Sequence, residues 1–80
     1  MLSKLSSTNK IVGAKQVKRA LNSQDIEAVF VANDAEHKVV DEIKEICIAK
    51  HIQVIYVDSM KKLGDACGID VNAATAALLK

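Results

Sequence analysis

Short apolar runs along the chain predict buried β-strands. Runs of β-branched and aromatic residues are typical of strands that are covered on both faces. The last segment, 72–79, is ambiguous, because its alanines and leucines favour helix by propensity. The pattern of residues alone leaves this segment undecided. Three other segments are expected to form strands: 10–13, 28–32 and 54–57.

Helices are predicted between these strands, because apolar residues there recur three and four positions apart. In the first of them Val17, Ala20 and Leu21 share one face. The charged residues of the second helix lie opposite its apolar stripe, as expected for a helix on a sheet. The expected helices cover about 14–22, 36–50 and 60–67, with Asp34 as the cap of the second, the pair Asp58-Ser59 as the cap of the third and Gly68 as its stop.

This alternation of strands and helices predicts a single α/β domain over residues 1–80. Connections between neighbouring strands place helices on both faces of the sheet, which gives a three-layer α/β/α sandwich. A chain of 80 residues has room for one modest core. The sequence contains no proline, and we find no linker or internal repeat that would divide it.

The charges are unevenly distributed, although the net charge is only +1. Residues 1–22 hold five cations and no acid, whereas residues 25–45 hold seven acids and two lysines. The molecule should therefore have one basic pole. Nucleic-acid binding requires such a local positive potential rather than a high overall charge.

The first helix begins with positive charge, where helices prefer negative charge. Its amino end carries about half a positive charge and several unpaired N–H groups, and here it is crowded by lysine and arginine. A basic helix start is suited to anions, and we expect a phosphate backbone. Lys15, Gln16 and Arg19 share one side of the polar face and can donate to nucleobase edges, while Gly13 permits close backbone approach. By spacing alone, a solvated basic face is an equally good interpretation.

Two apolar residues, Ile69 and Val71, follow the glycine that ends the third helix. They either fold inward as core, which the usual burial of such side chains favours, or form an exposed apolar patch that covers a base. The pattern does not choose between these interpretations.

Two segments resemble a known family. Gly13-Ala14-Lys15-Gln16-Val17-Lys18-Arg19 resembles the G-x-[NK]-[EQ]-x-x-[KR] motif of the kink-turn RNA-binding ribosomal protein family, the L-seven-Ae family, in its bacterial form. The segment 58–71 is similar to the one that ends in the second RNA-binding loop of that family. The two matches are in the right order and together span most of the chain, so they are more specific than one short pattern.

The resemblance implies a four-stranded mixed sheet, with a strand over 73–79 despite its alanines. It also implies that residues 1–9 form a reduced N-terminal segment of one or two helical turns preceded by disorder. In the family, the helix start enters the kink-turn at its tandem G·A pairs, and the apolar loop packs on a flipped nucleotide.

The same resemblance assigns roles to individual residues. Gly13 gives backbone approach, Lys15 and Gln16 approach guanines and phosphates, and Arg19 stands where the family usually has a base-contacting lysine. Ile69 and Val71 should cover the flipped base, and Asp70 between them belongs to the same RNA-binding loop. Lys61 and Lys62 are expected to contact phosphates, on general charge grounds as much as by the match.

Some residues depart from the family pattern. Asp65 replaces a common cation near the loop, and Asn72 replaces a glycine or proline, so we expect ordinary rather than extreme affinity. Arg19 keeps the charge of lysine with a different hydrogen-bond fork, which could shift the preferred bases.

Metal and catalytic chemistry are not indicated. His37 and His51 lie at opposite ends of one predicted helix, too far apart to share a metal, and neither has a cysteine at ligand spacing. Cys47 and Cys67 are expected to be buried, reduced thiols, and no histidine follows Cys67 as a local base. We therefore expect no enzyme activity, no metal and no cofactor.

Together these observations predict a non-enzymatic RNA-binding protein that recognises and stabilises a kink-turn in rRNA or a mRNA leader, as a ribosomal component or a free factor. We expect it to be a cytoplasmic monomer without a membrane segment. The alternative is a protein-interaction module that docks a partner through the acidic helix 36–50.

Overall fold

The structure, a computed structural model, describes residues 9–80. The expectation for the N-terminal segment therefore falls, apart from Asn9, outside the described residues. These described residues form seven elements: β1 (Lys10–Val12), α1 (Ala14–Ser23), β2 (Ile26–Ala32), α2 (His37–Ala49), β3 (Gln53–Val57), α3 (Met60–Cys67) and β4 (Thr75–Leu79).

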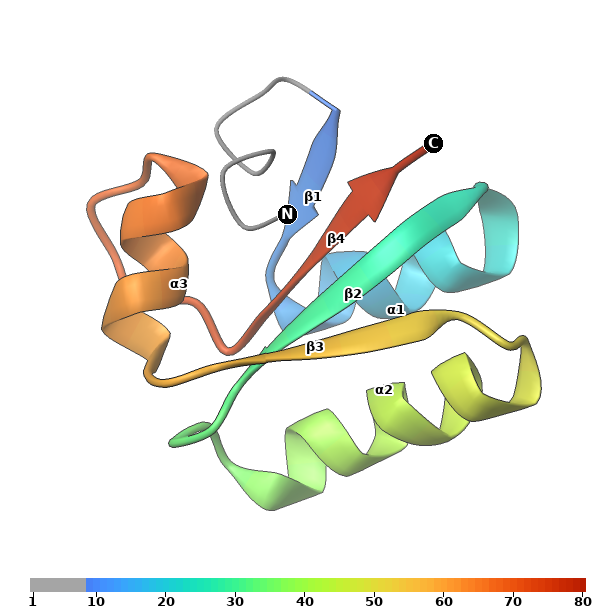
Figure 1. Cartoon of the computed structure of the whole chain (residues 1–80), viewed down its shortest axis with the longest axis horizontal. Helices are drawn as coiled ribbons and strands as arrows, with labels where there is room; N and C mark the ends of the chain where they lie inside the picture. Colours follow the sequence, from blue (N-terminus) through green and yellow to red (C-terminus); the bar gives the residue numbers. More distant parts are fainter. Residues whose placement is uncertain (1–8) are drawn as a thin grey trace.

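The four strands form one sheet in the order β1-β4-β2-β3. β2 and β3 are parallel, and β4 is antiparallel to both of its neighbours. α1 and α2 pack together on one face of the sheet, and α3 covers the other face (Figure 1). The predicted three-layer sandwich with a mixed four-stranded sheet is confirmed.

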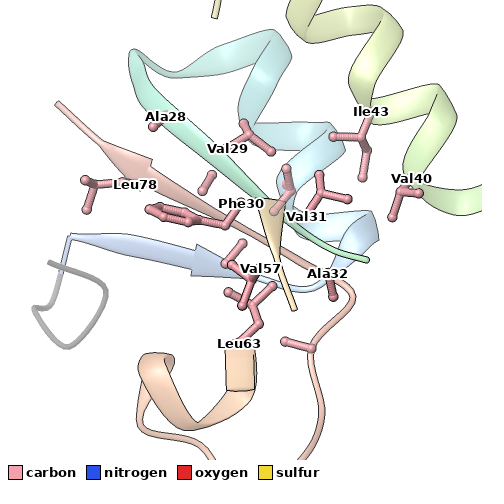
Figure 2. Packing of buried hydrophobic residues seen from close by; sticks show 14 of the residues in the cluster. Ala28, Val29, Phe30, Val31, Ala32, Val40, Ile43, Val57, Leu63 and Leu78 are labelled. Atoms are coloured by element: carbon pink, nitrogen blue, oxygen red, sulfur yellow. The ribbon is translucent and has the colours of Figure 1, made fainter. Parts of the chain in front are cut away.

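The core is built around β2, whose residues from Ala28 to Ala32 are almost completely buried. Because side chains alternate along a strand, Val29 lies on the side of α1 and α2, whereas Phe30 lies on the side of α3. Figure 2 shows Phe30 there with Val57 and Leu63. Burial on both faces explains why this strand is a continuous apolar run.

The ambiguous C-terminal segment is a strand, β4, in the centre of the sheet. Ala76 and Ala77 are fully buried between β1 and β2, and the Thr75 hydroxyl donates to the carbonyl of Phe30 at 2.7 Å. Pairing on both edges outweighs the helix propensity of alanine, which is worth less than about 1 kcal/mol per residue. The strand begins at Thr75, two residues later than the resemblance implied.

The helices begin and end within one residue of the expected ranges, but Asp34 does not have its predicted role. It does not cap α2, whose N-cap is Glu36 with no side-chain hydrogen bond. Instead its carboxylate accepts a hydrogen bond from the backbone N–H of Met60, the first residue of α3, at 2.7 Å. The prediction was wrong because Met60, 26 residues further along the chain, lies next to Asp34 in the fold. The Asp34 carboxylate accepts from the Met60 N–H instead of from the N–H groups at the start of α2. The cap of α3, in contrast, comes from the predicted pair Asp58-Ser59, with Ser59 as the N-cap, and Gly68 ends the helix as predicted.

None of the helices in the described part of the chain is long and apolar enough to cross a membrane. Both cysteines are free and buried, as the sequence predicted.

Candidate functional site

The three helices of residues 9–80 all begin at the same edge of the sheet. β1, β2 and β3 run in the same direction and β4 runs in the opposite one. The carboxyl ends of the first three strands and the amino end of β4 therefore lie together, on the left of Figure 1. The loop 68–74, which leads into β4, reaches the same edge. The two segments that the sequence singled out are thus brought to one side of the molecule.

Gly13 connects these two segments through a backbone hydrogen bond. Its N–H donates to the carbonyl of Thr75 at 3.0 Å, which ties the start of α1 to the end of the loop. Gly13 has a φ of 103°, where residues with a side chain are strained. A Cβ here would also lie 2.6 Å from the Gln16 side-chain oxygen. Glycine is therefore favoured at this position by its backbone conformation, since the exposed Gln16 side chain could move to make room for a Cβ.

The outer face of α1 presents the predicted cationic residues to solvent. Lys15, Gln16 and Arg19 are exposed, while the opposite face of the helix is buried. The first turn of α1 contains no acidic residue, and no side chain caps it. Lys18, further round the helix, forms an ion pair with Glu42 of α2. The charges of Lys15 and Arg19 have no ion-pair partner among residues 9–80.

In the loop after α3, one of the two apolar residues packs inward and the other is exposed, so each of the two interpretations holds for one of them. Ile69 is half-buried and packs against the core, whereas Val71 is 68% exposed and Asp70 between them is exposed. A Cβ on Gly64 of α3 would lie 2.2 Å from the Val71 carbonyl oxygen, so the loop backbone rests directly on the helix. The N–H of Ala73 also donates to the carbonyl of Met60 at 3.1 Å. The loop is therefore held by its backbone, which leaves the Val71 side chain free.

The two lysines of α3 are both exposed. Lys62 forms a surface ion pair with Asp58 at 3.1 Å, which offsets part of its charge but costs little to break. Lys61 has no ion-pair partner among the described residues.

The turn after β2, which contains Asn33 and Asp34, also lies at this edge of the sheet, and the sequence analysis did not predict this. In addition to the bond between Asp34 and Met60, the N–H of Asn33 donates to the carbonyl of Val57 at 2.8 Å. The turn is thereby fixed to the start of α3. No local sequence signal could identify these bonds, because their partners are distant along the chain.

The described residues offer no cluster of three or more metal-ligating side chains. Burial raises the pKa of the Cys47 thiol and of the Cys67 thiol, although Lys10 partly opposes this for Cys67. Protonated, buried thiols are poor nucleophiles. The groups that this edge presents to a ligand include the uncapped start of α1, the exposed cationic side chains and Val71.

Residues 1–80 match the ribosomal protein L7Ae/L30e/S12e/Gadd45 family over their whole length. The chain belongs to this family. A relative in Halalkalibacterium halodurans, an RNA-binding protein, is 50% identical over 74 residues, which cover 92% of this chain and 90% of that protein. An RNA-binding protein of Caldanaerobacter subterraneus subsp. tengcongensis is 52% identical over 68 residues, covering 85% and 83% respectively. The RNA-binding protein YbxF of Geobacillus stearothermophilus is 40% identical over 70 residues, covering 88% and 85%.

The fold of this L7Ae-family chain also matches a solved structure. The Giardia lamblia 15.5kD RNA binding protein superposes with a TM-score of 0.88 and 27% sequence identity, over 99% of this chain and 68% of that one. The resemblance inferred from the two motifs is thus confirmed by both sequence and structure.

Proposed function

We propose that this protein binds RNA at the edge of the sheet formed by the helix starts and the loop 68–74, and that its preferred target is a kink-turn. The main observation behind the proposal is that a basic surface and an exposed apolar residue lie next to each other. The uncapped, basic start of α1 lies beside a loop with an exposed valine, and the bond from Gly13 to Thr75 joins them. The relatives that are named RNA-binding proteins support the same conclusion.

The basic start of α1 acts as the reader in this proposal. Lys15 and Arg19 supply charge for phosphates and donors for guanine edges, and Gln16 offers both a donor and an acceptor. Gly13 lets the RNA approach the backbone N–H groups of the first turn. Lys61 and Lys62 provide flanking phosphate contacts.

The loop acts as a lid on an unstacked nucleotide. Single-stranded bases are commonly recognised when they are splayed out and packed against protein side chains. Val71 covers such a base with its exposed methyl groups, Ile69 supports it from the core side, and Asp70 lies between them in the same loop. Binding at both the reader and the lid stabilises the kinked form of the RNA.

We further propose that the protein acts as a cytoplasmic monomer, on rRNA within the ribosome or on a mRNA leader. The rival function is a protein-docking role for the acidic helix 36–50. It is favoured by Ile48 of α2, an apolar residue that is 72% exposed.

Salt dependence tests the electrostatic half of the proposal. If four to six phosphates are neutralised, the logarithm of the affinity for RNA should fall with the logarithm of salt concentration with a slope of roughly −3 to −5. The double variant Lys15→Gln, Arg19→Gln should make this slope shallower by about 2. A slope near zero for the unmodified protein, or partner binding that survives loss of both charges, would favour the rival.

A further inference from the structure

A groove lies between the first halves of α1 and α2, beside the basic start of α1. It has a volume of about 370 Å³. Its apolar lining comes from Ala14, Val39 and Ile43, of which Ile43 is buried in the core. The charged residues that line it are Lys15 and Lys18 of α1 and Lys38 and Glu42 of α2.

The balance of charge in this groove is positive. Lys18 is paired with Glu42, so these two charges offset one another. Lys15 and Lys38 make no ion pair with any residue in the range 9–80. The rest of α2 is acidic, and its other lysine within the helix, Lys44, is held by Asp41 at 3.8 Å and lies 5.1 Å from the centre of the Tyr56 ring. Lys38 is thus the cation of α2 that is available to a ligand in the groove.

We propose that this groove holds a stretch of sugar–phosphate backbone from one stem of the bound RNA, with Lys15 and Lys38 on its phosphates and the apolar lining against its riboses. The proposal rests on the RNA-binding function proposed above and extends the contact surface from α1 onto α2. A ribose–phosphate chain offers the alternation of charged and weakly polar surface that the groove complements. Lys15 belongs both to the basic start of α1 and to the groove. The RNA stem in the groove would therefore continue directly from the part of the RNA that contacts the start of α1.

The first test neutralises Lys38 and compares it with a matched control on the same helix. Lys50, the exposed C-cap of α2, lies outside the groove. At about 0.1 M salt, Lys38→Gln should weaken binding of a kink-turn RNA about tenfold and make the salt slope shallower by about 1, whereas Lys50→Gln should change affinity less than about twofold. Thermal unfolding of both variants checks the fold, which Lys38→Gln should not weaken because a cation in the first turn opposes the helix dipole.

The second test changes affinity in the opposite direction. Glu42→Gln removes the carboxylate that neutralises Lys18. Binding should then become several-fold tighter and the salt slope steeper by up to about 1. Partial unfolding cannot produce such a gain, so this variant separates a direct contact from a structural effect.

The possible outcomes distinguish failure of the groove proposal from failure of the proposed RNA-binding function. If the unmodified protein does not prefer a kink-turn RNA to one whose G·A pairs are replaced by Watson–Crick pairs, the proposed function fails and the groove proposal with it. If the preference is present but Lys38→Gln matches Lys50→Gln and Glu42→Gln has no effect, the groove proposal alone is overturned, and the groove is then available to a protein partner. Shortening each RNA stem in turn should abolish the effect of Lys38→Gln for one stem, and an effect that survives both truncations also overturns the proposal.

Discussion

The backbone of Gly64 in α3 packs directly against the carbonyl oxygen of Val71, at a separation that leaves no room for a side chain. A Cβ at position 64 would lie 2.2 Å from that oxygen, closer than real contacts allow. The loop that carries Val71 can therefore pack this closely on α3 only because Gly64 has no side chain.

The substitution Gly64→Ala should displace this loop. Overpacking of this kind costs about 1–3 kcal/mol of stability, and affinity for kink-turn RNA should fall because Val71 is moved away from the base. Urea unfolding and RNA titration measure the two effects. Asp65→Ala, an exposed change at the next position of α3, is the control and should not reduce either quantity. If Gly64→Ala binds RNA with unchanged affinity, the position of the loop does not matter for recognition.

The substitution Val71→Ala should separate binding from stability. Because Val71 is 68% exposed, truncation of its side chain should change the free energy of unfolding by no more than about 0.5 kcal/mol. Affinity should fall by up to about 15-fold, because two methyl groups buried against a base contribute about 1.6 kcal/mol. Ile69→Ala should lower both quantities, since Ile69 is half-buried against the core. A loss of stability without a loss of affinity in Val71→Ala would place the side chain in the core and remove its role as a lid.

The substitution Arg19→Lys tests base contact by the first helix. Lysine keeps the charge but replaces a planar fork of donors by a single ammonium group. We expect altered discrimination among RNAs with different G·A pairs, together with an unchanged salt slope. The measurement is a set of titrations against RNA variants at constant salt. If both proteins rank the variants identically, Arg19 contacts only phosphates.

Stability should decline at high pH because of the two buried thiols. Burial raises the pKa of Cys47 and Cys67 in the folded state, so the unfolded chain loses these protons first as pH rises. Above about pH 8.5 the unfolded state binds fewer protons, and the free energy of unfolding should fall by up to about 1 kcal/mol per thiol by pH 9.5. Urea unfolding at pH 7 and 9.5 tests this. The double variant Cys47→Ala, Cys67→Ala should be less stable at pH 7, but its free energy of unfolding should fall less between pH 7 and 9.5. If its free energy of unfolding falls as much as that of the unmodified protein, groups other than the two thiols cause the effect.

The sequence predicted the elements that carry strong local signals. The apolar run of β2, the Ser59 cap and the Gly68 stop each have a physical cause within a few residues, and each is found as expected. β4 could not be predicted from its residues alone, because alanine is stabilised in a strand here only by neighbours on both edges. The resemblance to the family supplied that information.

The site was predictable in part for the same reason. The basic face of α1 follows from helical periodicity, but the exposure of Val71 depends on the contact with Gly64. The role of Asp34 depends on Met60, and the groove depends on how α2 packs beside α1. These features arise from tertiary contacts, which no pattern along the chain encodes.

The most direct test of the central claim is a titration of the protein into a labelled kink-turn RNA, beside the same RNA with its G·A pairs replaced by Watson–Crick pairs. If the edge formed by the start of α1 and the loop 68–74 reads a kink-turn, the protein should bind the first RNA tightly and the second only weakly. Equal affinity for the two RNAs, or no binding to either, would contradict the account.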